Sequence, residues 1–137
     1  MARIICLDYG LKRTGIAVTD PLQIIATALD TIESKELFPF LKKYFAAETV
    51  ELILVGMPLN LDDTPTHATP LVEALINKLK KTFPAIPIQT VDERYSSKNA
   101  SRAMVQMGMK KKDRQVKANI DQIAATMLLQ EYLATKA

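Results

Sequence analysis

Two short runs of the chain, residues 4–7 and 52–55, consist only of apolar side chains. A strand with one face in water alternates apolar with polar residues, so an unbroken apolar run indicates a strand that is buried on both faces. Such a sheet needs helices packed on it, and parallel neighbours within it need a crossover helix to connect them. The two runs therefore predict an α/β fold whose sheet lies between helices.

The first part of the chain predicts a set of antiparallel strands. Its short apolar segments are separated by turn signals: Gly10 and Gly15 bracket a polar turn at residues 11–14, and Asp20-Pro21 follows soon after. This pattern predicts an antiparallel three-stranded meander. The predicted strands of the meander cover residues 3–7, 16–19 and 23–29.

Beyond the meander, helical and strand patterns alternate. Leu37 and Leu41 are at helical spacing, and Pro39 has to lie near the first turn of that helix. Pro87, near the start of another strand, indicates an edge position in the sheet. We expect a mixed five-stranded sheet with helices on both faces, in one domain over residues 1–137. The other predicted elements are strands at 51–56 and 86–91, a helix from about Thr69 to Phe83, a short helix from Ser96 to Gly108, and a last helix at 115–134.

Composition narrows the class of protein. Hydrophobic residues make up 48% of the 137 residues, which is enough for a core, and no apolar run approaches the ~18 residues of a membrane span. The single cysteine, Cys6, excludes an internal disulfide and fits a reducing cytosol. We therefore expect a cytoplasmic protein with no membrane segment.

Acidic residues stand at the ends of two predicted strands. Asp8 directly follows the first apolar run, and Asp92 and Glu93 follow the last predicted strand. Open α/β sheets bind ligands beyond the carboxyl ends of their strands, so these positions favour a site. Neighbouring strand residues point to opposite faces, so only one of Asp92 and Glu93 should face the same site as Asp8. The alternatives are that Asp8 caps the turn before Gly10, and that the later acids form a solvated ion pair with Arg94.

Asp121, on the last predicted helix, could complete that site. Ala124 and Ala125 lie three and four residues further on, and small side chains there allow the helix to approach the sheet closely. Asp121 could then reach over the sheet toward Asp8. The alternative is an exposed acid paired with Lys117, four residues earlier.

Asp8, Glu93 and Asp121, with Asp92 as an alternative ligand, would form a site of hard oxygen donors. Mg²⁺ or Mn²⁺ prefers carboxylates together with water and substrate phosphate. Two ions about 4 Å apart can activate water and stabilise the leaving oxygen of a phosphodiester. We therefore expect a metal-dependent nuclease in which Asp8, Glu93 and Asp121 are catalytic and two ions act with substrate bound.

A basic stretch lies between the second and third of these acids. Asp113 is the only acid between residues 94 and 117, and this excess of positive charge attracts phosphate backbones. The alternative is a solvated surface segment. The basic residues of the stretch are Arg94, Lys98, Arg102, Lys110, Lys111, Lys112, Arg114 and Lys117.

Two other kinds of site are excluded by the residues themselves. Gly10 and Gly15 have the spacing of a phosphate-binding loop, but Ile16 and Ala17 stand where lysine and serine or threonine are needed. His67 is the only histidine, so no multi-histidine metal centre can form.

Four motifs, in the family's order over nearly the whole chain, resemble the YqgF/RuvX family. Departures from the family pattern are Met57, Asp63 and Tyr95-Ser96-Ser97, and none of them removes a proposed ligand. Asp63 leaves the role of the second motif's loop open. The matching segments are residues 7–10 with 13–17 and 19–20, residues 55–60, residues 91–97, and residues 111–112 with 120–125.

This resemblance implies a ribonuclease H-like fold related to Holliday-junction resolvases. It also implies a cytoplasmic bacterial nuclease that matures the 5′ end of pre-16S ribosomal RNA. Asp8, Glu93 and Asp121 match the family's acidic residues, and Arg13 and Arg94 match arginines suited to phosphate contacts. With the basic stretch, the residues expected to bind nucleic acid are Arg13, Arg94, Lys110, Lys111, Lys112, Arg114 and Lys117.

Other functions stay open at this stage. One is a Holliday-junction resolvase-like DNA endonuclease, and another is a non-catalytic RNA-binding factor in ribosome assembly. An ATPase of the actin and sugar-kinase type is disfavoured, because that mechanism needs two lobes and 137 residues are too few. No motif distinguishes RNA from DNA, which depends on contacts to the 2′-hydroxyl. A homodimer would suit a symmetric junction, whereas precursor trimming does not require one.

Overall fold

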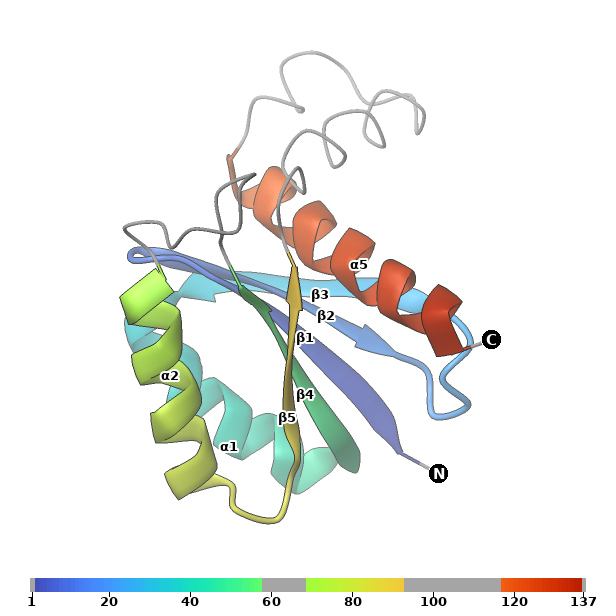
Figure 1. Cartoon of the computed structure of the whole chain (residues 1–137), viewed down its shortest axis with the longest axis horizontal. Helices are drawn as coiled ribbons and strands as arrows, with labels where there is room; N and C mark the ends of the chain where they lie inside the picture. Colours follow the sequence, from blue (N-terminus) through green and yellow to red (C-terminus); the bar gives the residue numbers. More distant parts are fainter. Residues whose placement is uncertain (1, 58–68, 93–116, 137) are drawn as a thin grey trace.

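The structure, a computed structural model, describes residues 2–57, 69–92 and 117–136. A five-stranded sheet lies at its centre, in the order β3-β2-β1-β4-β5 (Figure 1). The elements are β1 (Arg3–Tyr9), β2 (Arg13–Thr19), β3 (Ala26–Glu33), the short 3₁₀ helix η1 (Ser34–Glu36), α1 (Leu37–Ala47), β4 (Val50–Met57), α2 (Thr69–Thr82), β5 (Ile88–Asp92) and α5 (Lys117–Lys136).

The strands pair in the two ways that the sequence predicts. β1 is antiparallel to β2, and β2 is antiparallel to β3, which confirms the meander. β1, β4 and β5 are parallel, with α1 before β4 and α2 between β4 and β5 as connections. The predicted mixed α/β sheet is therefore confirmed.

The two apolar runs are buried on both faces of the sheet, as expected. Ile5 and Leu7 point to the face covered by α1 and α2, where the larger core cluster lies. Ile4 and Cys6 point to the other face and pack with Leu129 and its neighbours in α5. Figure 1 shows α1 and α2 on one side of the sheet and α5 on the other.

The turn between β1 and β2 is shorter than the sequence predicts. Residues 13–15 belong to β2 rather than to the turn, and β1 continues to Tyr9. The Gly10 amide donates to the Arg13 carbonyl at 2.9 Å. A Cβ atom on Gly10 would lie only 2.6 Å from that carbonyl oxygen, so this close turn requires glycine. As a consequence, Asp8 and Gly15 lie inside paired strands.

The predicted third strand is wrong at both ends. It was expected over residues 23–29, but β3 covers Ala26–Glu33. The Asp20 carboxylate accepts hydrogen bonds from the amides of Ile24 and Ile25, both at 2.8 Å, which holds these residues in the turn. Gln23 has a φ of 59°, in the left-handed region, and cannot belong to a strand.

The helices agree closely with the predictions. Pro39 lies in the first turn of α1, where a missing amide costs no hydrogen bond, and Pro87 lies just before the edge strand β5. α5 covers Lys117–Lys136 rather than residues 115–134. The short helix predicted from Ser96 to Gly108 lies outside the described residues. None of the described helices is long and apolar enough to cross a membrane.

Candidate functional site

Asp8 lies one residue before the end of β1, on the face covered by α5. Side chains alternate along a strand, and Ile4 and Cys6, which share its parity, pack in the cluster that contains Ala125 and Leu128 of α5. The Asp8 side chain is half-buried. The structure therefore places this carboxylate at the rim of the layer between the sheet and α5.

Two glycines flank Asp8 in the neighbouring strands. Gly15 of β2 is its partner in the antiparallel register. Leu7 pairs with Val55 in the parallel register with β4, so the next position along the two strands sets Asp8 beside Gly56. Neither glycine projects a side chain above the sheet. Residues 15, 8 and 56 lie side by side in β2, β1 and β4, and among them Asp8 alone has a side chain on the face covered by α5.

This glycine pair was not recognised as part of the site from the sequence. Both glycines lie in segments that resemble family motifs, but the sequence analysis gives neither a role at the site: Gly15 bounds the predicted turn, and Gly56 ends a predicted strand. The signal was nevertheless present, because a glycine within a buried strand often marks a place where a ligand or another backbone comes close. Finding it needs the register between β1 and β4, which joins residues nearly fifty positions apart.

α5 runs antiparallel to β1 across this face. Its C-terminal part, with Gln130, Leu133 and Ala134, lines a hollow of about 370 Å³ together with Ile24 and Ile25 of the β2–β3 turn. That turn lies at the start of β1, since the Ile4 amide donates to the Thr19 hydroxyl at 2.9 Å. The N-terminal part of α5 is therefore directed toward the end of β1 that carries Asp8 (Figure 1).

Residue 121 lies in the first turns of α5. It precedes Ala125 by four residues and Leu128 by seven, and both of these side chains are buried against the sheet. Positions at this spacing share one face of a helix. The helix backbone thus sets residue 121 on the stripe that faces the sheet, while the Asp121 side chain is outside the described side chains.

The structure does not test the other predicted ligands or the basic residues between 94 and 117. Among the side chains that the structure describes, no group of three His, Cys, Asp or Glu residues could hold a metal ion. The residues that lie outside the described ranges are Glu93, Arg94, Lys110, Lys111, Lys112 and Arg114. Asp92 ends β5 and Lys117 begins α5, but their side chains are not described.

Arg13 is the predicted nucleic-acid contact that the structure does describe. It is the first residue of β2 and pairs with Glu33 of β3. Its side chain lines a hollow of about 460 Å³ with Leu11, Lys12 and Lys35. Arg13 therefore lies at the same end of the sheet as Asp8.

Comparison with known proteins finds relatives over nearly the whole chain. The model of the family RuvX, described as "Holliday junction resolvase", matches residues 2–135. A "Putative pre-16S rRNA nuclease" of Flavobacterium psychrophilum is 48% identical over 136 residues, which is 99% of each chain. A protein of the same name in Bacteroides thetaiotaomicron is 47% identical, again over 99% of each chain.

Among solved structures, the chain is similar to T. thermophilus RuvC in complex with a Holliday junction substrate. The TM-score is 0.58, and the alignment covers 100% of this chain and 97% of that chain at 16% sequence identity. At this identity the likeness concerns the fold alone, and it confirms the predicted ribonuclease H-like α/β architecture.

Proposed function

The chain belongs to the RuvX family, and on this premise we propose that it is a metal-dependent nuclease that processes the 5′ end of pre-16S ribosomal RNA in the cytoplasm. Relatives named "Putative pre-16S rRNA nuclease" match this chain over nearly its full length and theirs. A single nuclease domain over residues 1–137 accounts for the activity, because the family model spans residues 2–135.

The observation that carries the proposal is the setting of Asp8. The carboxylate lies at the rim of the α5 face, with Gly15 and Gly56 on either side. Ile4 and Leu129 belong to the same core cluster. From Ile4 to Asp8 the strand advances about 13 Å, and from Leu129 back to residue 121 the helix advances about 12 Å. These lengths support Asp8 and Asp121 as parts of one site, with Glu93 as the third acid and Asp92 as its substitute.

The residues fit a divalent cation. Asp8, Glu93 and Asp121 offer only carboxylate oxygens, which Mg²⁺ and Mn²⁺ accept, and the two flanking glycines leave room above Asp8 for an ion and its waters. When bound, one or two such ions would supply positive charge against the phosphodiester and make water more acidic. The chain's own part is to hold these oxygens on a rigid strand and helix, which keeps their positions fixed during the reaction.

Binding of the substrate backbone falls to the basic residues. Arg13 lies at the Asp8 end of the sheet and has a planar guanidinium that can grip a phosphate with two hydrogen bonds. Contacts of this type set the position of the strand without reading its sequence. The other residues assigned to this task are Arg94, Lys110, Lys111, Lys112, Arg114 and Lys117.

A Holliday-junction DNA endonuclease is the second candidate, because the family model carries that description. The two candidates differ in symmetry. A four-way junction presents two equivalent strands, so its resolution calls for a two-fold homodimer, whereas trimming one RNA end does not.

A cleavage assay separates the candidates. Pre-16S RNA with its 5′ extension and a four-way DNA junction are incubated with the protein, with and without Mg²⁺. We expect Mg²⁺-dependent shortening of the RNA 5′ end, absent in Asp8→Asn and retained in Asp30→Asn, which removes the same charge from the exposed edge strand β3. Cleavage of the junction alone would favour the second candidate. RNA binding without cleavage of either substrate would indicate an assembly factor instead.

A further inference from the structure

Two hollows lie at the end of the sheet that carries Asp8. One, of about 500 Å³, is lined by Tyr9 of β1 and by residues of α1 and α2. The other is the hollow of about 460 Å³ beside Arg13. Leu11 and Lys35 line both hollows, so the two adjoin at these side chains, and together they are called here the basic groove. Tyr9 follows Asp8 directly in β1, so the groove lies next to the candidate site.

The basic groove carries an excess of positive charge. Its described cations are Lys12, Arg13, Lys35 and Lys78, and its one acid is Glu33. The Lys35 ammonium lies 3.2 Å from the Glu33 carboxylate, but both side chains are mostly exposed, so water and salt weaken that pair. The groove therefore attracts anions with the charge of several phosphates.

Apolar surface lies between these cations. Leu71, Leu75 and Lys78 share one face of α2, and the two leucines line the groove with Tyr9. Leu11, at the tip of the β1–β2 turn, is 74% exposed and adds apolar surface to the groove. The Lys78 ammonium lies 4.3 Å from the centre of the Phe38 ring, which holds this charge at the groove wall.

A buried hydrogen-bond network fixes the groove's shape. The Ser34 amide donates to the Lys12 carbonyl at 2.9 Å, and the Ser34 hydroxyl donates to the Gly10 carbonyl. The Thr14 and Ser34 hydroxyl oxygens are 2.9 Å apart, so Thr14 can donate to Ser34. The turn with Lys12 and the helix η1 with Lys35 are thereby held together. The groove is preformed, which reduces the entropy lost on binding.

We propose that the basic groove binds a single-stranded segment of the nucleic acid whose cleavage is assigned to Asp8. Single-strand sites combine a positive track for phosphates with flat or apolar surfaces for bases, and the groove has both. Its hollows have the size of small-ligand pockets, about 300–1,000 Å³, which suits single nucleotides. This inference rests on the proposed function and adds a substrate class: structured RNA or DNA with an unpaired extension at the cleavage site.

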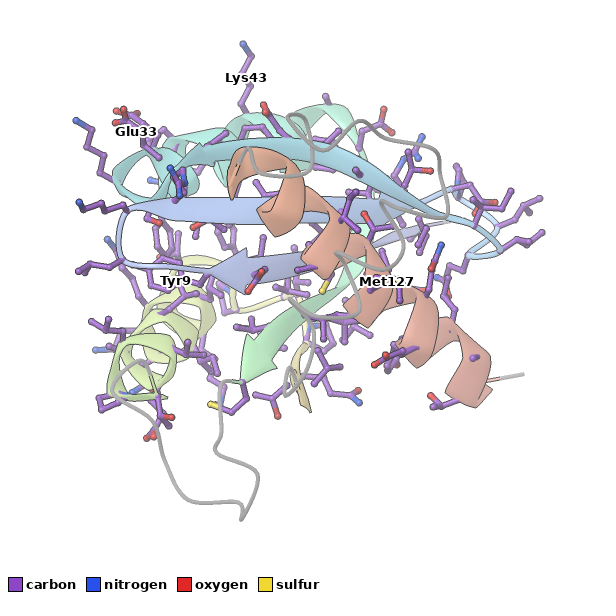
Figure 2. All side chains as sticks on the ribbon, turned by 90° about the horizontal axis from the view of Figure 1, so that it is seen from above. Tyr9, Glu33, Lys43 and Met127 are labelled. Carbon is purple, nitrogen blue, oxygen red and sulfur yellow. The ribbon has the colours of Figure 1, made fainter. Side chains whose placement is uncertain are left out.

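The test compares two double charge reversals. Lys35→Glu/Lys78→Glu changes two exposed lysines of the groove. Lys42→Glu/Lys43→Glu changes two exposed lysines of α1 that do not line it and alters the net charge equally. Figure 2 shows Tyr9 and Glu33 at one end of the sheet, with Lys43 projecting away from them. Thermal unfolding of both variants verifies that they remain folded.

The probes are an RNA hairpin with a blunt end and the same hairpin with an oligouridine extension, measured in EDTA so that no cleavage occurs. We expect the extension to tighten binding to the unmodified protein and the α1 variant about tenfold, and the groove variant to lose this gain. The salt dependence of the extended probe should also weaken in the groove variant, by about 0.7 in the log–log slope per lost phosphate contact, or roughly 1.4 for two.

Any of three binding results would overturn the inference, and a competition result would be a fourth. The three are no gain from the extension in the unmodified protein, a gain that survives in the groove variant, and an equal loss in the α1 variant. Competition by poly-glutamate stronger than by oligouridine would do so as well, since it would indicate a groove for acidic peptides. Failure of the proposed function looks different. Extension binding through the groove, without cleavage of RNA or junction DNA, would refute the nuclease and leave the groove as a single-strand binding site.

Discussion

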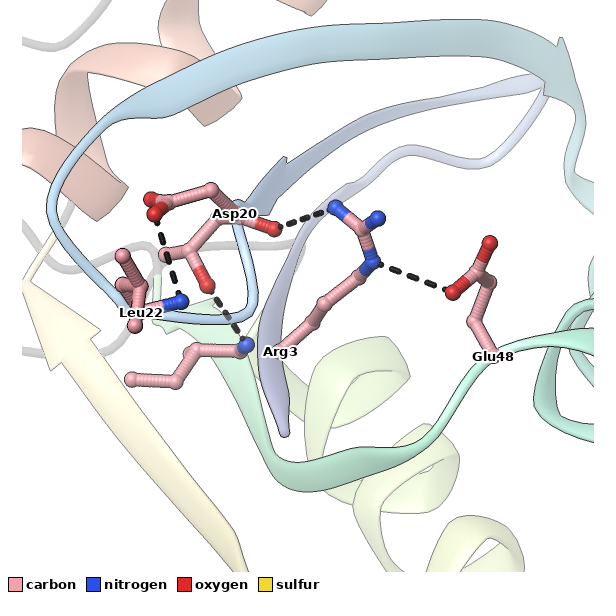
Figure 3. Close-up of polar contacts among 6 residues, drawn as sticks. Arg3, Asp20, Leu22 and Glu48 are labelled. Carbon is pink, nitrogen blue, oxygen red and sulfur yellow. Dashed lines mark hydrogen bonds and ion pairs between the residues drawn. The ribbon is translucent and has the colours of Figure 1, made fainter. Parts of the chain in front are cut away.

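The two ends of the sheet each place an aspartate beside a strand end, and the two carboxylates have opposite settings. Asp20, just after β2, accepts hydrogen bonds from the amides of Ile24 and Ile25 at 2.8 Å. It also accepts one from the Leu22 amide at 3.2 Å (Figure 3). These bonds, that of Ile25 above all, lower the pKa of Asp20 below its ordinary value. The charge of Asp20 therefore stabilises the turn that follows β2.

The rest of this opposite end is likewise closed by contacts within the protein. The Arg3 guanidinium donates to the Thr19 carbonyl at 3.0 Å and to the Glu48 carboxylate at 3.3 Å (Figure 3). At the site end, by contrast, glycines flank Asp8 in both neighbouring strands. The neighbours of an acid at a strand end therefore decide whether it can bind a ligand. Amide donors of a turn make it structural, and missing side chains leave room for a ligand.

The largest expected effect is that substitution of Asp8 changes the cleavage rate, whereas substitution of Asp20 changes the melting temperature. Asp8→Asn should lower cleavage by about 10³-fold, roughly 4 kcal/mol of transition-state stabilisation, with little change in the melting temperature. Asp20→Asn should cleave normally once folded and melt at a lower temperature. Single-turnover cleavage and thermal unfolding of both variants check this. If Asp8→Asn cut as well as the unmodified chain, the contrast between the two ends would be lost.

The next effect concerns the glycines beside Asp8. Gly15→Val would place two methyl groups next to the carboxylate, and a displacement of about 1 Å at a reacting centre can cost 10²-fold in rate. Overpacking under α5 should also cost about 1–3 kcal/mol of stability. Ala17→Val is the matched control, because Ala17 is buried on the same face of β2, two residues away from the site. It should lose similar stability and keep its cleavage rate. Equal rates in the two variants would show that the space beside Asp8 has no function.

The sequence predicted the features that depend on local pattern. The unbroken apolar runs at residues 4–7 and 52–55 indicated strands buried on both faces, and the structure confirms both. Asp8 at the end of the first run was placed correctly near a strand terminus. Helices were predicted well because their apolar stripes repeat over many residues, as in α2.

What the sequence could not predict depends on contacts between distant residues. The start of β3 was wrong because hydrogen bonds from Asp20 decide it, and these do not appear in an apolar pattern. The position of Gly56 beside Asp8 follows from the Leu7–Val55 pair one residue earlier, in a register that only the folded sheet defines. Ser34 was not noticed at all, since its role depends on the carbonyls of Gly10 and Lys12, more than twenty residues earlier.

A smaller effect tests the role of Asp20 through pH. Its lowered folded pKa means that the ionised form stabilises the fold at pH values above the unfolded pKa, and that this contribution disappears as pH falls through the folded pKa. Asp20→Ala should therefore melt a few degrees below the unmodified chain at neutral pH, and the difference should shrink below about pH 4. Melting curves between pH 3 and pH 8 measure it. A difference that is the same across this range would mean that the charge of Asp20 has no part in the turn.

The smallest expected effect is at the Arg3–Glu48 pair. Their side chains are 25% and 43% exposed, so the pair is screened by solvent, and Glu48→Gln should cost at most about 0.5 kcal/mol. Arg3→Met should cost more, because it also removes the donor to the Thr19 carbonyl beside the turn. Urea unfolding at low and high salt separates the two, since only the ion-pair part is screened. If Glu48→Gln destabilised the protein more than Arg3→Met, the ion pair rather than the carbonyl contact would be what closes the opposite end of the sheet.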